Sequence, residues 1–280
     1  MSKLELANVW FKYPGTKHYV LKNVNLVANE GEVSIILGGN GAGKTTLLMI
    51  ASGLLIPSQG KVLINGSNLT NLLPGIRKAI GIMFQNPDDQ LFNPTVYEEI
   101  AFVLKQINRN EEDKILDIIK KLKLPKEILS KPPYLLSFGI KKMVALASIL
   151  VYEPSIILLD EPFSNLSPDY IKVIMEIIRE LRSEDKTVII ASSNTESVSK
   201  IGDNYYILSK GRIIGKGGKE ILLKRDLLHI AELSPPTLIN LMLDSKCIER
   251  LANLDLQYND IVNLLKMCCE KLKESREEAV

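Results

Sequence analysis

The sequence predicts an α/β fold in which crossover helices connect the strands of a parallel sheet. The buried-type run at residues 33–37 is followed by a glycine-rich loop and then by residues 44–54, which predict a helix. Strand-like runs at 156–159 and 187–191 are separated by apolar residues at helical spacing. Strands that alternate with helices in this way pair in parallel, because each helix carries the chain back across one face of the sheet.

Other elements follow in chain order. Alternating residues at 4–10 predict a strand, and residues 61–64 predict another between Gly60 and the turn pair Asn65-Gly66. Residues 95–150 are predicted to form a helical subdomain. Its helices are interrupted at Pro125 and at Pro132-Pro133, because the proline ring blocks helix continuation.

The last quarter of the chain predicts a hairpin and then helices. Residues 205–214 predict the hairpin, which turns at Lys210-Gly211, and residues 219–280 predict helices broken at Pro235-Pro236. The final helix carries one apolar stripe, which either serves a partner helix or packs against this chain's own body; it consists of Ile261, Leu265, Cys268 and Leu272.

Composition excludes several classes of protein. Apolar residues make up 46% of the 280 residues and charged residues 24%, which is typical of a globular protein and not of a disordered or collagen-like one. The net charge of +2 is spread along the chain, so no nucleic-acid partner is expected. Cys247, Cys268 and Cys269 form no CxxC pair, so neither a zinc site nor a disulfide framework is predicted. Without a signal-peptide core or a run of about 18 apolar residues, we expect a cytosolic chain that meets a membrane only through a partner.

Residues 38–46, GGNGAGKTT, match the phosphate-binding loop G-x-x-x-x-G-K-[ST], here called the P-loop. The glycines allow the backbone N–H groups to face a triphosphate, and the next helix directs its positive end at the same phosphates. Lys44 is expected to reach the β- and γ-phosphates, and Thr45 to bind Mg²⁺. The candidate ATP-binding residues of the loop are Asn40, Gly41, Ala42, Gly43, Lys44, Thr45 and Thr46.

Two adjacent carboxylates end the apolar strand at 156–161, IILLDE. At the carboxyl end of a strand that follows a P-loop, Asp160 is expected to face the metal ion and Glu161 to polarise the attacking water. The sequence therefore predicts a site that hydrolyses Mg-ATP.

With these motifs the chain resembles the ATPase family of ABC transporters, and within it the energy-coupling-factor and cobalt/nickel importer branch. The resemblance covers about residues 3–242. It depends on three segments, FKYPG at 11–15, MFQNPDDQLFNPTVYEEIAF at 83–102 and KEILLKRDLLHIAELSPPTLINLM at 219–242. It implies an ABC cassette with a RecA-like core, an N-terminal antiparallel β part and a helical subdomain, spanning 1–225, followed by a C-terminal helical extension at 226–280.

The resemblance also assigns roles to residues outside the two motifs. Tyr13 would stack on adenine, although Tyr19 could take that role, and Gln85 would reach the magnesium ion and the attacking water. Residues 88–92 would form a helix that docks on a membrane coupling protein. In this family Ser137 and Gly139 of the signature loop contact the ATP held by the other subunit of a dimer.

Three motifs depart from the family pattern. The signature loop, normally LSGGQ, reads LSFGI at 136–140, so Phe138 and Ile140 replace a glycine and a polar side chain. Ser167 stands where the D-loop carries aspartate, and Ser193 stands where the family has the histidine that senses the γ-phosphate. Because phosphoryl transfer is catalysed mainly by positioning and charge stabilisation, ATP binding is expected to survive while turnover falls.

A homodimer would carry these faults at both ATP sites, whereas an intact homologous partner would separate them. A heterodimer is therefore favoured and a homodimer is the alternative. The further partners implied are a transmembrane coupling protein and a substrate-binding membrane subunit, with the chain peripheral on the cytoplasmic face of the membrane. The cargo would be a vitamin or a transition-metal ion.

Two other classes remain open. A soluble ABC protein of the DNA-repair or translation type shares these motifs, but usually carries a long coiled coil or two fused cassettes, and neither is predicted here. A nucleotide-binding regulatory or structural protein with little hydrolysis is the second alternative, and an ATPase assay separates it from a transport ATPase.

Overall fold

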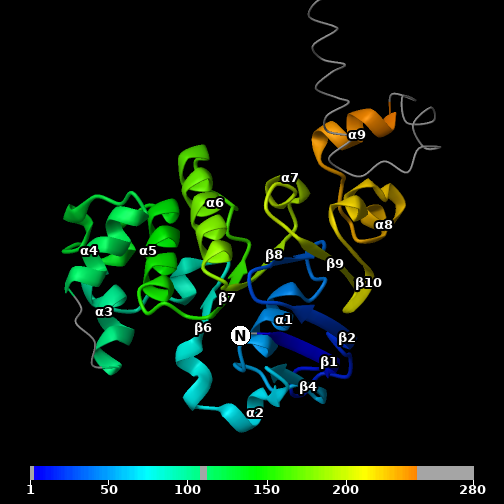
Figure 1. The fold of residues 1–280 in the computed structure, drawn as a ribbon, viewed down its shortest axis with the longest axis horizontal. Helices are drawn as coiled ribbons and strands as arrows, with labels where there is room; N and C mark the ends of the chain where they lie inside the picture. Colours follow the sequence, from blue (N-terminus) through cyan, green and yellow to red (C-terminus); the bar gives the residue numbers. More distant parts are fainter. Residues whose placement is uncertain (1–2, 108–111, 245–280) are drawn as a thin grey trace, which may run out of the picture.

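Two β-sheets organise the protein, whose computed structural model describes residues 3–107 and 112–244 (Figure 1). The first is antiparallel, with strand order β2-β1-β4-β5, and the second has the order β10-β9-β3-β8-β7-β6. In the second sheet all neighbouring strands from β9 to β6 run parallel, and only β10 is antiparallel to its neighbour. The predicted α/β fold with a parallel sheet and an antiparallel N-terminal part is confirmed.

The strands have the following bounds: β1 Leu4–Phe11, β2 Leu21–Ala28, β3 Val33–Leu37, β4 Gln59–Ile64, β5 Ser67–Asn68, β6 Ile80–Met83, β7 Ile156–Asp160, β8 Thr187–Ser192, β9 Asn204–Ser209 and β10 Arg212–Gly217. The α-helices are α1 Lys44–Ala51, α2 Leu69–Leu72, α3 Val96–Gln106, α4 Glu112–Lys121, α5 Phe138–Leu150, α6 Pro168–Ser183, α7 Thr195–Val198, α8 Arg225–Ile230 and α9 Thr237–Asp244. Short 3-10 helices lie at η1 Gly75–Ala79, η2 Pro87–Asp89, η3 Lys126–Ile128, η4 Pro133–Leu135 and η5 Lys219–Leu223.

Helix α1 lies between the two sheets. Its Leu47, Leu48 and Ile50 share one hydrophobic core with the antiparallel sheet and with one face of the parallel sheet, which contributes Ile36 and Leu158. Its buried residues fix this helix relative to both sheets. The P-loop that precedes it is therefore held on a rigid frame.

The opposite face of the parallel sheet is covered by α6 and by the helical subdomain. Ile174 and Ile178 of α6 belong to the same core as Met143 and Leu146 of α5 and Ile100 of α3. Figure 1 shows α3, α4 and α5 as a group beside α6, at one end of the sheet. The predicted helical subdomain is thus confirmed, and its bounds at 95–150 stay a proposal.

The C-terminal elements α8 and α9 follow β10 (Figure 1). Leu228, Ala231, Leu233 and Ile239 are buried in the larger core, so this part of the extension packs against the cassette. The predicted stripe at Ile261, Leu265, Cys268 and Leu272 and the three cysteines lie outside the described residues. The boundary at 225 stays a proposal.

Several boundaries differ from the sequence prediction. The helix predicted at 44–54 ends at Ala51, and Gly53 adopts a left-handed φ of 74° that turns the chain out of the helix. Gly60 lies inside β4, where a Cβ would come 2.2 Å from the carbonyl oxygen of Asn8. Strands β2 and β6 were not anticipated.

Candidate nucleotide-binding site

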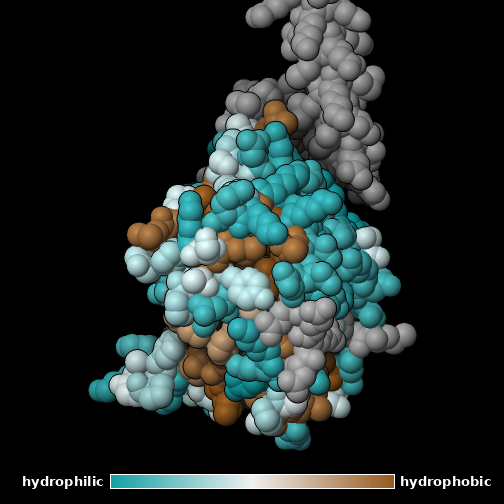
Figure 2. Space-filling model, turned by 90° about the vertical axis from the view of Figure 1, so that its left-hand side faces the viewer, coloured by the Kyte–Doolittle hydropathy of each residue, from teal (hydrophilic) through white to brown (hydrophobic). Residues whose placement is uncertain are grey.

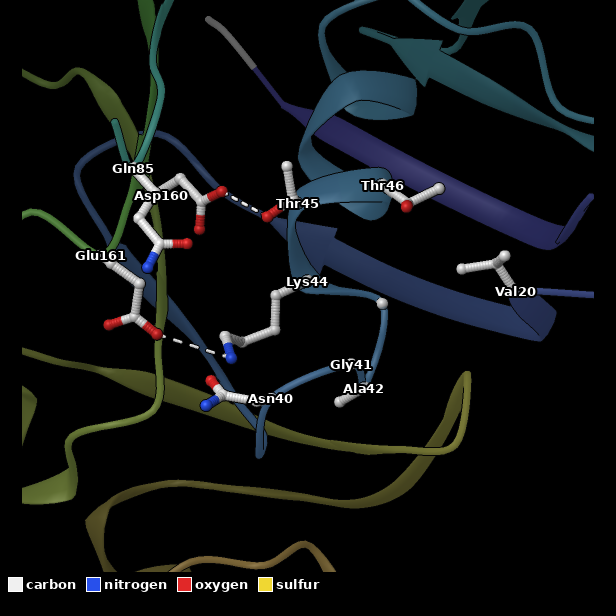
Figure 3. Close-up of a pocket in the computed structure, with 11 residues that line it drawn as sticks. Val20, Asn40, Gly41, Ala42, Lys44, Thr45, Thr46, Gln85, Asp160 and Glu161 are labelled. Carbon is white, nitrogen blue, oxygen red and sulfur yellow. Dashed lines mark hydrogen bonds and ion pairs between the residues drawn. The ribbon is translucent and has the colours of Figure 1, made fainter. Parts of the chain in front are cut away.

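The P-loop connects β3 to α1 and forms one wall of a cavity of about 240 Å³. Gly41 and Gly43 have φ values of 75° and 106°, in the region that residues with a Cβ rarely adopt. Figure 3 shows the loop facing Gln85, Asp160 and Glu161 across the cavity. The lining residues are Val20, Asn40, Gly41, Ala42, Gly43, Lys44, Thr45, Thr46, Gln85, Asp160 and Glu161.

Lys44 is the first residue of α1, and its side chain is almost fully buried. Its Nζ donates hydrogen bonds to the carbonyl oxygens of Gly38 (2.8 Å) and Gly39 (3.1 Å), and lies 3.5 Å from Oε1 of Glu161. A buried ammonium group beside the positive end of a helix attracts a polyphosphate strongly.

Asp160 and Thr45 meet at the base of the cavity. The Thr45 hydroxyl donates to Oδ2 of Asp160 at 2.5 Å, while Oδ1 is buried without a hydrogen-bond partner among the described residues. Burial raises the pKa of the Asp160 carboxyl group. A hydroxyl, a carboxylate oxygen without a partner and the nearby amide of Gln85 form an oxygen set of the kind that Mg²⁺ prefers, so these residues fit the ion.

Glu161 follows β7 in a left-handed conformation, with φ of 47°. Its Oε1 accepts a hydrogen bond from the main-chain N–H of Ser193 at 2.6 Å, and its Oε2 accepts one from the Ser192 hydroxyl at 3.2 Å. The strained backbone and these two bonds direct the carboxylate into the cavity. Ser193 therefore contacts Glu161 through its backbone, and its side chain is exposed.

The two candidate adenine-stacking tyrosines have different surroundings. The Tyr13 hydroxyl is 3.0 Å from the Thr46 hydroxyl, so its ring lies beside the P-loop helix. Tyr19 packs edge-to-face against Trp10, with ring centroids 5.3 Å apart. Val20, which the sequence analysis did not single out, lines the cavity directly.

The signature residues lie apart from this cavity. Ser137 is the exposed N-cap of α5, and neither Ser137 nor Gly139 is among the described residues that line the cavity. The Phe138 ring is partly buried and lies 5.8 Å from Nζ of Lys142. The sequence-predicted site residues thus fall into two groups, one around the cavity and one at the start of α5.

The segment after Gln85 corrects one expectation. Only the 3-10 helix Pro87–Asp89 forms where a helix was expected at 88–92, because the Asn86 side chain caps a single turn and the chain then leaves it. The Asp88 carboxylate accepts a hydrogen bond from Nζ of Lys141 on α5 at 2.7 Å.

The fold and the site together define a P-loop ATPase. The family model described as "ABC transporter" matches residues 21–164. The energy-coupling factor transporter ATP-binding protein EcfA of Methanosphaera stadtmanae is 38% identical over 83% of this chain and 86% of its own length. EcfA of Methanocaldococcus jannaschii is 34% identical over 95% of this chain and 99% of its own.

Solved structures agree with these relatives. Clostridium perfringens cbiO1, described as part of the ABC transporter complex cbiONQ, superposes with a TM-score of 0.70 at 31% identity, covering 90% of this chain and 98% of that one. A dimeric ATP-binding cassette bound to ADP and phosphate superposes with a TM-score of 0.70 at 28% identity, covering 77% and 98%. The chain belongs to the ABC transporter family and is an ATP-binding subunit whose ATPase activity is coupled to transport. The helices within residues 3–107 and 112–244 include none with the length and hydrophobicity of a transmembrane span.

Proposed function

We propose that this chain energises the import of a micronutrient, a vitamin or a transition-metal ion, as one half of an asymmetric ATPase dimer. The observation that carries the dimer is the exposed position of Ser137 at the start of α5, outside the chain's own cavity. Serine, free backbone amides and a helix N-terminus form a good site for an anion, and here they face outward. The ATP held by a second subunit would supply that anion.

In the proposed reaction this chain's residues bind and orient. The P-loop N–H groups and Lys44 hold the phosphates, and Glu161 accepts the proton of the water that attacks the γ-phosphorus. The bond from that phosphorus to the β,γ-bridging oxygen breaks, and ADP and phosphate leave. Thr45, Asp160 and Gln85 would hold Mg²⁺, which neutralises charge on the phosphate oxygens.

The proposed asymmetry depends on two altered motifs, the switch region and the signature loop. Ser193 offers no imidazole, and its hydroxyl side chain is exposed. Phe138 and Ile140 replace smaller or more polar residues in the signature loop. With a homologous partner that has an intact signature loop and histidine, the ATP site on this chain would lack only the histidine at 193. The ATP site on the partner would have only the altered signature loop of this chain. We therefore favour a heterodimer.

An apolar surface supports docking to a membrane coupling protein. Phe92 is 68% exposed, and its ring packs edge-to-face on Phe102, with centroids 5.1 Å apart. Buried Glu99 holds this loop, because Oε2 accepts the main-chain N–H groups of Phe92 (2.9 Å) and Asn93 (2.8 Å). Figure 2 views the molecule from the side of α3 to α5 and shows hydrophobic patches among hydrophilic surface. A preorganised pair of exposed aromatic rings is a typical anchor for a protein interface.

The names of the relatives support the proposed transporter assembly. Two are named as energy-coupling factor proteins and one as part of cbiONQ. We propose the same assembly here, with a coupling protein and a membrane subunit that captures the substrate, at the cytoplasmic face of the membrane. We also propose residues 1–225 as the ATPase domain and 226–280 as an extension.

Copurification tests this proposal. The tagged chain is recovered from gently solubilised membranes of its own cells, and its partners are identified by mass spectrometry. We expect a second ATPase with an intact LSGGQ and switch histidine, a polytopic coupling protein and a substrate-binding membrane subunit. Recovery only from the soluble fraction, alone or as a homodimer, would favour a nucleotide-binding regulator. ATP hydrolysis by the purified chain alone at tens per second, a typical enzyme rate, would exclude the need for a heterodimer.

A further inference from the structure

Lys142 is a fully buried cation whose three protons all go to uncharged oxygens. It lies on α5, and its Nζ donates to the carbonyl oxygen of Glu161 at 2.6 Å, to the carbonyl oxygen of Ser164 at 3.1 Å and to the Ser164 hydroxyl at 2.8 Å. These three bonds use the full donor capacity of a lysine. Burial lowers the pKa of Lys142 to about 8, and the negative charges of Glu161 and Asp160 oppose this shift.

The bonds of Lys142 secure the turn that presents the Glu161 carboxylate. With φ of 47°, Glu161 adopts a conformation that is unfavourable for a residue with a side chain. Its carbonyl oxygen also accepts bonds from the main-chain N–H and the hydroxyl of Ser164, at 3.2 Å and 2.9 Å, but both come from within the same turn. Lys142 alone, among these donors, connects the turn to another element of the fold.

That other element begins with the signature loop. Ser137 is the N-cap residue of α5 and Phe138 is the first residue of the helix, so Lys142 lies just over one turn into the same helix. The Phe138 ring, 5.8 Å from Nζ of Lys142, packs beside it. Because an α-helix moves as a unit over one turn, a displacement of Ser137 is accompanied by a displacement of Lys142.

We infer that Lys142 is a positioning residue that sets the backbone of Glu161 and links it to the signature loop, so that two ATP sites in a dimer are coupled through this side chain. Glu161 faces the cavity of its own chain, and Ser137 faces outward. The link between sites rests on the proposed function, in which the signature loop binds the ATP of a second subunit. The positioning of Glu161 does not depend on a dimer.

Matched substitutions test the positioning role in the full chain. Lys142→Met keeps most of the side-chain volume and removes the three donors, whereas Lys142→Arg keeps a cationic donor. Lys121→Met, which breaks the partly exposed ion pair with Glu180 on α6, is the control for loss of a lysine. For Lys142→Met we expect kcat to fall between about tenfold and a hundredfold, with Kd for a fluorescent ATP analogue unchanged within about twofold, partial recovery in Lys142→Arg, and no change in Lys121→Met.

Hydrogen–deuterium exchange gives a readout that does not require turnover. Lys142→Met should increase exchange in the peptide that covers 160–165, without a change in the P-loop peptide. If kcat and exchange at 160–165 both match the wild type, or if Kd rises as much as kcat falls, the positioning role is wrong. If Lys142→Met does not fold, Lys142→Gln, whose shorter neutral side chain cannot make the same three bonds, takes its place, and wild-type exchange and kcat in that variant would equally contradict the positioning role.

The coupling between sites has its own readout. We expect the wild-type assembly to hydrolyse ATP with a Hill coefficient above 1 and Lys142→Met to lower it towards 1. A wild-type coefficient of 1, or a coefficient that the substitution leaves unchanged, would overturn the link. A chain that stays monomeric with saturating ATP, yet shows the local effect on Glu161, would refute the proposed dimer and the link through it, and would leave the positioning role supported.

Discussion

The main-chain N–H of Ser193 donates to Oε1 of Glu161 at 2.6 Å, so the loop after β8 holds the Glu161 carboxylate through its backbone. Glu161 receives a second bond from the Ser192 hydroxyl and lies 3.5 Å from Nζ of Lys44. The carboxylate is therefore oriented from two sides by groups of its own chain. This arrangement separates the position of Glu161 from the identity of the side chain at 193.

Glu161→Gln should abolish hydrolysis while ATP stays bound. The amide has nearly the same shape but cannot accept a proton from water, and loss of a general base costs on the order of a hundredfold or more in rate. Turnover and the Kd of a fluorescent ATP analogue are measured, with Glu176→Gln on exposed α6 surface as control. Undiminished turnover in Glu161→Gln would remove this residue from its role.

Ser193→His should raise turnover if the missing imidazole limits it. The side chain at 193 is exposed next to the site, and its backbone bond to Glu161 is available to any residue. A restored charge-stabilising donor is expected to give about tenfold or more in kcat. If Ser193→His leaves kcat unchanged while Phe138→Gly raises it, the signature loop is limiting instead.

The parts of the site that could be predicted from the sequence are those whose chemistry is local. The P-loop and the acids at 160–161 are contiguous motifs, each beside a buried strand. Ser192 and Lys142 act through contacts with Glu161, 31 and 19 residues away, and no local pattern indicates such contacts. Val20 reaches the cavity only because the fold brings it there.

The unanticipated strands have physical causes. Strand β2 pairs with β1 through two irregularities, so its buried Leu21 and Val24 lie three residues apart and break the two-residue period. Strand β6 has only four residues, one of them Gly81, and is defined by its pairing with β7. In both cases long-range pairing overrides a weak local pattern.

Gly39→Ala should destabilise the protein and weaken ATP binding. The Gly39 N–H donates to the carbonyl oxygen of Ala231 at 2.9 Å, and a Cβ would lie 2.9 Å from Cβ of Glu232 and 3.0 Å from that carbonyl oxygen. To accommodate the new Cβ, the P-loop must move away from the segment after α8. This movement lowers the free energy of unfolding by about 1–3 kcal/mol. Urea unfolding and ATP-analogue binding check it.

Gly75→Ala is the control for this substitution, because nothing lies within 4 Å of its added Cβ. It should leave the free energy of unfolding and the ATP affinity close to those of the wild type. Equal behaviour of the two alanine variants would show that the P-loop does not depend on the Ala231 contact.

Phe92→Asp should weaken association with the membrane partners and leave ATP binding by the full chain intact. The ring is exposed beside Phe102, and a charge at the centre of an apolar contact removes a hot spot of about 2 kcal/mol or more. Quantitative copurification measures the association with the membrane partners. The control is Ile56→Asp, which changes a similarly exposed apolar residue between α1 and β4. Equal losses in both variants would contradict a docking role for Phe92.

The lowered pKa of Lys142 predicts that the free energy of unfolding increases as the pH rises above 8. Its pKa is lowered from 10.5 to about 8 by burial, so between these values the unfolded chain holds a proton that the folded chain has released. The free energy of unfolding gains a positive slope with pH wherever the unfolded state binds more protons. Below pH 8 the folded protein bears the full free-energy cost of burying the charged Lys142 amine. Above pH 8 the amine loses its proton and this cost decreases progressively.

The comparison of wild type with Lys142→Met isolates this contribution, because the methionine does not titrate. We expect the free energy of unfolding of the wild type to increase relative to Lys142→Met as the pH rises from 7.5 to 9.5, measured by urea titration at each pH. Titration of Tyr152 changes the free energy of unfolding only above this window. Burial raises the pKa of Tyr152 from 10 to about 12, so its contribution changes above pH 10. A constant difference between wild type and variant over the window would mean that Lys142 keeps its ordinary pKa, and a decreasing one would mean that its pKa is raised.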